Sequence, residues 1–485
     1  MDPFGVWGTA APYEGCISWQ IVRSCTESRQ GLVRFDLLSI LCYDYSLLSP
    51  EASLTIENAL PKNFQRNFWC LAMDYCFFGV ALTFVSTNTV LPGFLTALGA
   101  SSAFIGIVSS LQSASWLLPQ LFAARYVASQ PRKKPYILWP AAIGRSLLLA
   151  VAILIWAIGN RNDNLVAVVV AVVTVGFWVG DGLASVPWFD LLSNMIPPRR
   201  RGRLTGVGQV LSGTLGFAAG FIVEWLLSDR GPAFPNNYAT LYLLGFVMLV
   251  FSFAAIAFAV EIPGTPKEKT PTWREYVPQL WRVFKRDRVF RRFILARQLS
   301  GLGSLSIPFY MPYALERLDL PAQVAGRYTS IGVVGSILAA VLFGWLNERY
   351  GSKRVILSGL TLGVLVPGFA LFLPTILTNP AWLAWGYGLV FFSLSAMMSS
   401  MMSGWMTYVL EWAPEEDRPT YVGLTNTLNG ITPLLSTLGG LILQWSGKDY
   451  RLLFAITLTG LVLTWPLSLR LPEPRHKEQA ANPVS

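Results

Sequence analysis

Long apolar runs, separated by short polar or basic segments, occupy most of the chain from residue 68 onward. A hydrocarbon core of roughly 30 Å is crossed by about 20 residues of helix, whereas a membrane β-strand needs only about half as many. Twelve runs reach the helical length, and packed membrane helices tolerate the glycine and proline within them. The predicted spans are 68–92, 102–127, 136–158, 165–193, 204–227, 239–260, 293–316, 325–347, 354–375, 381–412, 421–445 and 451–470.

One four-residue pattern occurs twice in the chain, at the end of the fourth run and at the end of the tenth. In both copies Trp and Pro end an apolar run, and Arg and Gly open the next. The copies are Trp188, Pro197, Arg201 and Gly206 and, 217 positions later, Trp405, Pro414, Arg418 and Gly423. This duplication predicts two similar halves, an arrangement in which secondary transporters bind solute between the repeats.

The patterns together predict an all-α membrane protein with 12 transmembrane helices in two pseudo-symmetric six-helix halves. We expect an N-terminal bundle at 63–260 and a C-terminal bundle at 293–471. Residues 261–292 open with prolines and then place apolar residues at helical spacing among basic ones, which predicts a cytoplasmic linker with an amphipathic helix. Residues 1–62 show neither a helical period nor a signal peptide, so they are either a poorly ordered cytoplasmic tail or a gene-model artefact. Residues 472–485 form a polar C-terminal tail.

Composition supports a membrane protein, because 53% of the residues are hydrophobic and only 13% are charged. The net charge of +10 comes from 37 Lys and Arg against 27 Asp and Glu. With both termini in the cytoplasm, all but seven of the basic residues fall on cytoplasmic segments. This positive-inside bias predicts a multi-pass protein of the cytoplasmic membrane and explains the charge without nucleic acid as a partner.

The sequence lacks the residues and motifs that several kinds of chemistry require. The chain has one histidine, His476 in the C-terminal tail, and five cysteines without metal-ligand spacing. It has no Gly-x-x-x-x-Gly-Lys phosphate loop and no Gly-x-Ser-x-Gly nucleophile elbow. We therefore expect no enzyme activity, no cofactor, no metal site and no ATP drive within this chain.

A loop after the eighth run resembles the signature of the major facilitator superfamily, Gly-x-x-x-Asp-Arg-x-Gly-Arg-Lys-Arg/Lys. The matching residues are Gly344, Glu348, Arg349, Gly351, Lys353 and Arg354, with Glu348 where the family has Asp. The first-half copy is eroded and keeps Arg125. The resemblance covers roughly Phe68 to Leu471. The family's antiporter glycine-proline signature in the fifth span is missing, which lowers the odds of drug:proton antiport.

The resemblance implies that the eighth span packs against the fifth across the two halves. Glu348 would then approach the start of the fifth span near Arg201, where a helix N-terminus adds partial positive charge. Arg418 occupies the same place in the second copy of the repeat. We predict a latch on the cytoplasmic side, and the alternative is a basic loop that only sets topology.

Three ionisable residues lie inside predicted spans: Asp74 in the first, Arg145 in the third and Asp181 in the fourth. Such residues usually face a cavity or a partner. The resemblance implies that the first, fourth, seventh and tenth spans line the central cavity, so Asp74 and Asp181 are candidates for proton coupling. The alternative is that they compensate Arg145, with Asp181 as the neighbour nearest in depth.

The seventh and tenth spans supply candidates for a substrate cavity. Methionines adapt to varied solute shapes, and tryptophan offers a stacking face. The candidates are Gln298, Tyr310, Met398, Met402 and Trp405. Their alternative role is ordinary helix packing. Arg297 lies close to the start of its span, and we expect its side chain to snorkel to the cytoplasm.

The favoured function is secondary active transport of a small organic solute by alternating access, coupled to protons through intramembrane carboxylates. The expected partners are a small-molecule substrate, the proton and the lipid bilayer, and the expected state is a monomer. A uniporter would share the fold without the proton. A non-transporting sensor or assembly protein would need a partner-binding extension, for which residues 1–62 are the candidate.

Overall fold

The structure is a computed structural model that describes residues 63–159, 162–263, 281–414 and 417–475. The predicted N-terminal tail and most of the predicted linker helix lie outside these residues. The regular secondary structure of the described residues is helical, with no β-strand within those ranges, as the apolar runs predict.

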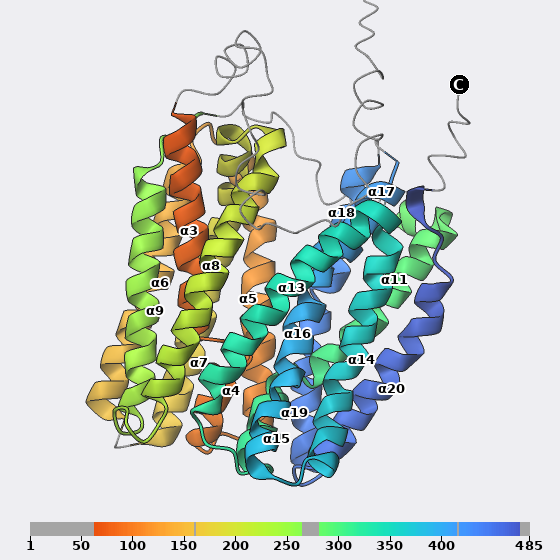
Figure 1. Cartoon of the computed structure of the whole chain (residues 1–485). Helices are drawn as coiled ribbons and strands as arrows, with labels where there is room; N and C mark the ends of the chain where they lie inside the picture. Colours follow the sequence, from red (N-terminus) through yellow and green to blue (C-terminus); the bar gives the residue numbers. More distant parts are fainter. Residues whose placement is uncertain (1–62, 160–161, 264–280, 415–416, 476–485) are drawn as a thin grey trace, which may run out of the picture. The chain divides into compact units, whose positions relative to one another are not determined.

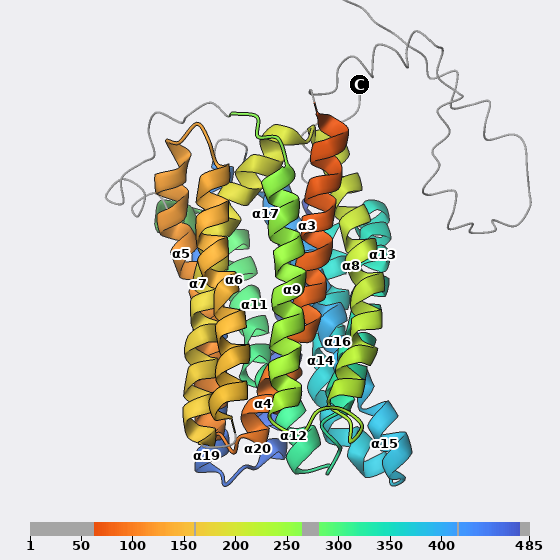
Figure 2. The same ribbon diagram turned by 90° about the vertical axis from the view of Figure 1, so that its left-hand side faces the viewer.

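The first half contains seven helices within the described residues, and the first predicted span is divided into α3 and α4. Their bounds are α3 (Phe64–Phe84), α4 (Val90–Ala97), α5 (Ser102–Ala128), α6 (Lys134–Ile158), α7 (Asp163–Met195), α8 (Pro198–Leu226) and α9 (Asn236–Phe258). Helix α7 packs against α5 and α6, whereas α3 packs against α8 and α9. Figure 2 shows these helices running together on one side of the bundle.

The second half contains more interruptions. Its elements are α11 (Arg288–Ser300), η2 (Gly301–Leu305), η3 (Ile307–Phe309), α12 (Tyr310–Glu316), α13 (Val324–Tyr350), α14 (Ser352–Ile376), α15 (Pro380–Gly386), α16 (Gly388–Ser400), the π-helix η4 (Met401–Met406), α17 (Thr407–Trp412), α18 (Arg418–Asn429), η5 (Thr432–Leu434), α19 (Leu435–Trp445) and α20 (Tyr450–Leu469). Helix α16 packs against α13 and α14, and α14 packs against α20.

Nine helices within the described residues are long and apolar enough to cross a membrane. The other three predicted spans coincide with α5 and with two segments that the structure divides. The seventh span is divided into α11, η2, η3 and α12, and the eleventh into α18, η5 and α19. The helical membrane architecture is confirmed, whereas the count of twelve stays a prediction.

Basic residues mark one end of the helices. Arg66 and Lys134 lie at the starts of α3 and α6, Arg349 lies near the end of α13, and Lys353 lies at the start of α14. We call this the basic end and the other the opposite end. In Figure 1 the basic end is at the top.

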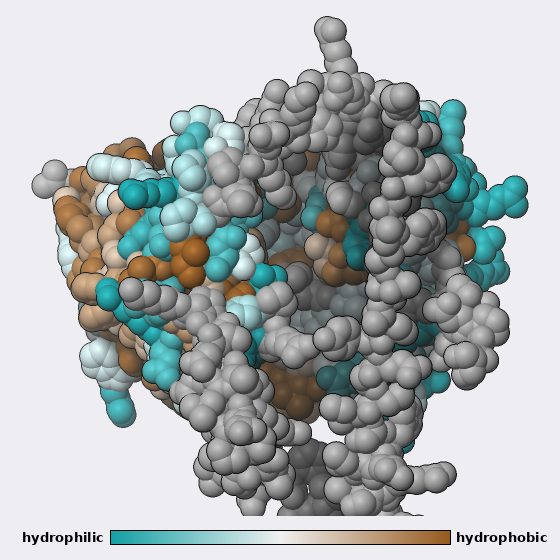
Figure 3. Space-filling view, turned by 90° about the horizontal axis from the view of Figure 1, so that it is seen from above, coloured by the Kyte–Doolittle hydropathy of each residue, from teal (hydrophilic) through white to brown (hydrophobic). Residues whose placement is uncertain are grey.

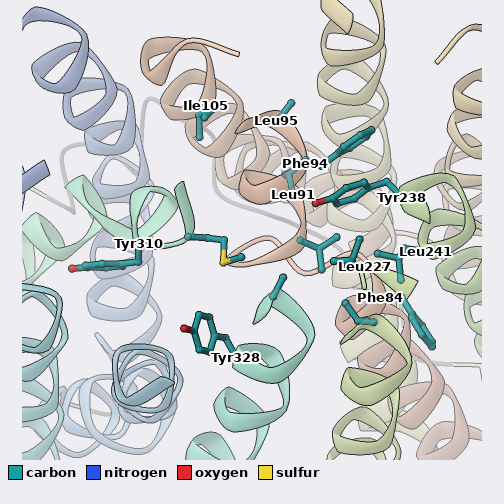
Figure 4. Packing of buried hydrophobic residues seen from close by; sticks show 14 of the residues in the cluster. Phe84, Leu91, Phe94, Leu95, Ile105, Leu227, Tyr238, Leu241, Tyr310 and Tyr328 are labelled. Carbon is teal, nitrogen blue, oxygen red and sulfur yellow. The ribbon is translucent and has the colours of Figure 1, made fainter. Parts of the chain in front are cut away.

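The two halves contact each other toward the opposite end, where hydrogen bonds cross between them. The hydroxyls of Thr89 and Thr329 lie 2.6 Å apart. Ser110 of α5 donates to the carbonyl of Pro433 and accepts from the backbone N–H of Thr437. Apolar side chains from both halves gather at the same end, with Phe94 stacked on Tyr238 and with Tyr310 and Tyr328 on the other side (Figure 4).

Helices α8 and α13 run antiparallel across the boundary between the halves. A β-carbon at Gly213 would lie 2.4 Å from Cδ1 of Ile337, and one at Gly220 would lie 1.9 Å from Oγ of Ser330. Glycine therefore permits this close approach. Gly206 lies on α8 seven residues from Gly213, in the direction of the basic end.

The halves separate toward the basic end. A β-carbon at Gly206 or at Gly344 would meet no other atom within 4 Å. Figure 1 shows α8 and α13 diverging in this direction, and Figure 3 shows a hollow at this end in which hydrophilic and hydrophobic residues are both visible. The structure is thus closed at the opposite end and open at the basic end.

Candidate functional site

Several of the predicted spans are interrupted in the structure, and the segments α4, η3 and η5 at these breaks contact the other half. The breaks lie at residues 85–89, between α3 and α4, at 301–309 and at 430–434, and η4 adds a π-helical segment at 401–406. Transporters commonly bind substrate where membrane helices are discontinuous, and π-helical segments often occur at functional sites. These four segments belong to the first, seventh, eleventh and tenth predicted spans.

A small cavity inside the first half is not a solute site. Its volume is about 20 Å³, and its lining includes Leu82, Trp178 and Tyr242. That volume holds roughly one water molecule. The recess open at the basic end is therefore the better candidate for binding an organic solute.

Asp74 lies at the centre of a polar cluster that joins four helices of the first half. Its side chain accepts hydrogen bonds from Trp188 Nε1 at 2.8 Å and from Ser252 Oγ at 2.5 Å. Arg145 Nη2 lies 3.9 Å from Asp74 Oδ1, and Arg145 Nη1 donates to the carbonyl of Leu249. Asp74 and Arg145 are only 5% and 8% exposed. The ion pair that Arg145 forms is therefore with Asp74, where sequence reasoning favoured Asp181.

Asp181 has a different environment. Its Oδ2 accepts a hydrogen bond from Trp116 Nε1 of α5 at 3.0 Å. The residue is half-buried, and no ion pair of Asp181 occurs among the residues that the structure describes. A β-carbon at the adjacent Gly182 would lie 2.5 Å from the carbonyl oxygen of Trp116, so α5 and α7 approach closely here. This carboxylate is held by a neutral donor.

In the second half, Arg297 of α11 does not snorkel outward as expected. The residue is 8% exposed, and its guanidinium carbon lies 5.2 Å from the ring centroid of Trp405. Arg297 Nη1 donates to Ser300 Oγ at 3.2 Å. Nε of Arg297 is buried without an acceptor among the described residues. The Trp405 ring that lies against the guanidinium is itself packed on Phe293, 5.5 Å away between ring centroids.

The tryptophan of the repeated pattern makes a similar kind of contact in each half. Trp188 contacts the ionisable residue Asp74 on the first helix of its half, and Trp405 contacts the ionisable residue Arg297 on the first helix of the other half. The first contact is a hydrogen bond to a carboxylate, and the second is a ring face beneath a cation. The duplication thus places groups of opposite charge at similar places in the two bundles.

The other cavity candidates differ in their surroundings. Tyr310 is buried against Phe454 and accepts from Tyr387 through its carbonyl oxygen, so it lies in the packed core of the second half. Met398 is 41% exposed, and Gln298 is half-buried with Nε2 lacking an acceptor among the described residues. Met402 lies in η4, and the structure does not describe its side chain.

The residues of the predicted latch are engaged within their own halves. Arg201 donates to the carbonyls of Ser193 and Ile196, and Arg475 donates to the carbonyl of Glu348. The Glu348 residue itself is exposed. Because the halves are apart at the basic end, the predicted approach of Glu348 to α8 stays a prediction for another state.

The rest of the loop signature packs locally. Arg349 lies over the ring of Trp345, Arg354 lies over that of Tyr350, and Lys353 is half-buried. Gly351 has a φ of +89°, which glycine adopts without strain. Arg418 begins α18, whereas the side chain of Arg125 is not described.

Sequence reasoning missed the neutral partners of the carboxylates. Trp116 and Ser252 were not among the candidate residues. A side chain that can donate a hydrogen bond and lies at the depth of a buried carboxylate could have indicated them. No group of three or more His, Cys, Asp or Glu that could hold a metal occurs within the described ranges.

The chain is similar in sequence and in fold to known proteins. A family model described as Major Facilitator Superfamily matches residues 212–398 and 299–484. A quinate permease of Neurospora africana is 24% identical over 346 residues, which cover 61% of this chain and 63% of that protein. This chain thus matches less than two thirds of the permease's length.

Two further proteins match over longer stretches. An uncharacterized protein of Mycobacterium tuberculosis is 25% identical over 399 residues, or 78% of this chain and 75% of that one. The crystal structure of a mutant form of the nucleoside transporter NupG superposes with a TM-score of 0.61 at 15% identity. The match covers 84% of this chain and 100% of the transporter, and at this identity it concerns the fold.

Proposed function

Because this chain belongs to the major facilitator superfamily, we propose that it is a secondary active transporter that moves a small organic solute by alternating access, driven by a proton gradient. It is a multi-span membrane protein of a transporter family and not an enzyme. The observation that carries the mechanism is the asymmetric contact between the halves, which meet at the opposite end and separate at the basic end. Rocking about this boundary would expose the recess to each side in turn.

The basic end is proposed to face the cytoplasm. Arg66, Lys134, Arg349 and Lys353 lie at helix ends there, and cytoplasmic segments of membrane proteins carry an excess of such residues. The described conformation would then be open to the cytoplasm. The proposed location is the cytoplasmic membrane, with both termini inside.

Asp181 is the proposed coupling residue. A proton bound to Asp74 would weaken its ion pair with Arg145, which is itself buried. Asp181 accepts from the neutral Trp116, so it can gain and lose a proton without leaving a cation unpaired. Asp74 and Arg145 are then primarily a structural pair in this proposal.

The proposed solute class is supported by the quinate permeases among the relatives, which are named for an organic solute. Flux of quinate into liposomes that contain the purified protein is therefore the first transport assay, with a set of other organic acids, sugars and nucleosides beside it. For one proton per solute, a gradient of one pH unit should support about tenfold accumulation.

The decisive variant is Asp181→Asn, with Asp163→Asn as its control at the exposed start of the same helix. We expect Asp181→Asn to abolish accumulation against a gradient and to retain exchange of labelled for unlabelled solute. Asp163→Asn should behave as the wild type. Wild-type flux that is independent of the pH gradient would instead show a uniporter. Absence of flux for every solute would favour a non-transporting sensor or assembly protein.

A further inference from the structure

The cation at Arg297 lacks the compensation that the other buried arginine of the described bundle has. Arg145 is as buried as Arg297, yet it lies next to the Asp74 carboxylate and donates to a backbone carbonyl. Among the described residues, Arg297 forms no ion pair, and its one hydrogen-bond acceptor is the hydroxyl of Ser300. A buried charge without an opposite charge is costly, and such residues in membrane proteins commonly mark a substrate path.

Two local features compensate the Arg297 charge only in part. The Trp405 ring face attracts the cation, and the carboxyl end of α11 supplies partial negative charge. Neither feature accepts the N–H groups in the plane of the guanidinium. Nε of Arg297 is buried without an acceptor among the described residues. A guanidinium is a planar fork of donors that matches the geometry of a carboxylate, and Nε is one of the donors in that plane.

The segment that follows Arg297 leads to the boundary between the halves. Arg297 lies about one helical turn before Gly301, where a β-carbon would be 2.4 Å from Cγ2 of Thr432. Thr432 belongs to η5, which packs against α5 of the first half. The neighbouring Gln298 also has a donor, Nε2, without an acceptor among the described residues.

We propose that Arg297 binds the carboxylate of an organic anion and that Gln298 Nε2 is a second donor to the same solute. This proposal rests on the transport function above and names its substrate class. The solute's carboxylate supplies the negative charge that Arg297 lacks, whereas Arg145 has its own partner in Asp74. Met398, exposed on the tenth predicted span, offers an adaptable apolar surface for the rest of the solute.

The test is ligand-dependent thermal unfolding of the full-length protein in detergent. The probes are acetate, benzoate, cyclohexanecarboxylate, succinate and quinate, each beside its uncharged amide. At least one carboxylate should raise the melting temperature, and its amide should do so only at about 10- to 100-fold higher concentration, because hydrogen bonds to a charged group are the strong ones.

Three variants locate the effect. Arg297→Gln should raise the Kd of the carboxylate about 10- to 100-fold. Arg297→Lys should bind with an intermediate Kd, because lysine keeps the charge but not the planar fork. Arg292→Gln removes an exposed arginine from the same helix and should bind as the wild type.

The unliganded proteins distinguish binding from a structural role. Arg297→Gln loses a buried charge without an ion-pair partner, so its unliganded melting temperature should equal or exceed that of the wild type. A lower melting temperature would reveal a structural partner and overturn the proposal. Carboxylates that bind Arg297→Gln as tightly as the wild type, or no carboxylate that binds at all, would also overturn it.

The transport assay distinguishes failure of the proposed anion site from failure of the proposed transport function. Flux of uncharged solutes that is unchanged in Arg297→Gln would refute the anion site and leave secondary transport standing. Carboxylate binding through Arg297 without flux in liposomes would refute transport and leave the site standing.

Discussion

At the scale of single residues, Arg145 shows how a buried charge can connect several helices. Its partners come from α3 and α9, and Trp188 of α7 contacts the same carboxylate. Four helices of the first half therefore meet at one polar cluster. Because the buried interior of the bundle offers this cluster little water, each member depends on the others for its hydrogen bonds.

Removal of one partner should destabilise the first half more than removal of both. We expect Arg145→Gln to lower the free energy of unfolding by about 3 kcal/mol, because Asp74 would remain buried without its cation. The double variant Arg145→Gln with Asp74→Asn should recover part of this loss. Denaturant unfolding in micelles would measure both, with Arg203→Gln at an exposed site of α8 as the control. Additive effects of the two substitutions would contradict the pairing.

Sequence alone could find the buried ionisable residues but not their partners. Asp74, Arg145 and Asp181 are conspicuous because charges are rare inside apolar runs. Which carboxylate pairs with Arg145 depends on the rotation of α3, α6 and α7 about their axes, and a run of apolar residues on every face does not specify that rotation. Arg297 was placed too close to the surface for a related reason. Its burial depends on the tertiary contact with Trp405 of the tenth predicted span, which the sequence does not specify.

At the scale of elements, the opposite end contains a polar contact between the halves. Arg327 of α13 donates to Glu224 of α8 at 2.5 Å, and its guanidinium lies 4.3 Å from the ring centroid of Trp385. Another carboxylate at this end, Glu316, accepts from Lys448 and Tyr450 of its own half. The first pair must break if the halves part at this end, whereas the second can persist.

These two carboxylates permit a matched comparison. Glu224→Gln should favour opening of the opposite end by about 0.5 to 1 kcal/mol, the usual range for a partly exposed ion pair. Glu316→Gln should leave the conformational equilibrium unchanged. Distances between spin labels on α8 and α13 would report the populations. Equal shifts in the two variants would show that loss of any ion pair at this end has the same effect.

The apolar runs specify the helices well and their breaks poorly. Each predicted span coincides with helix in the structure, because a long apolar run in a bilayer has few other ways to satisfy its backbone. The divisions at residues 301–309 and 430–434 contain Gly301, Pro308, Gly430 and Pro433. Similar residues lie within unbroken helices, such as Pro119 in α5 and Pro140 in α6. Tertiary contacts therefore decide which of these residues interrupt a span.

At the scale of the whole molecule, the duplicated pattern predicted two halves, and the loop signature indicated the family that the comparisons show. The conformation could not be predicted, because a protein that works by the proposed alternating access also forms a second state, closed at the basic end, from the same sequence. The residues that separate the two states are those between the halves. They include the glycines of α8 and α13.

The contacts of α8 and α13 continue in register toward the basic end. Gly220 faces Ser330, and seven residues along α8 Gly213 faces Ile337, which lies seven residues along α13 in the other direction. The next step pairs Gly206 with Gly344, both surrounded by open space in this structure. We expect these two glycines to meet when the basic end closes. Cysteines at both positions should form a disulfide only in that state, and a carboxylate ligand trapped between the halves should increase its yield.

A pair of cysteines at Gly206 and Gly368 is the control, because Gly368 lies on α14 and also has open space around it. No disulfide should form there in any state. Equal yields for the two pairs would mean that collision between proteins, and not closure, joins the thiols.

The unused space at Gly206 also makes the protein a practical tool. A bulky side chain at this position is compatible with the described conformation and would block the proposed closure at the basic end, so one substitution would produce a conformation-locked variant without an antibody or a cross-link. Such a variant would keep a single face of the recess exposed. Unknown solutes could then be captured from cell extracts on a protein that is unable to carry them across.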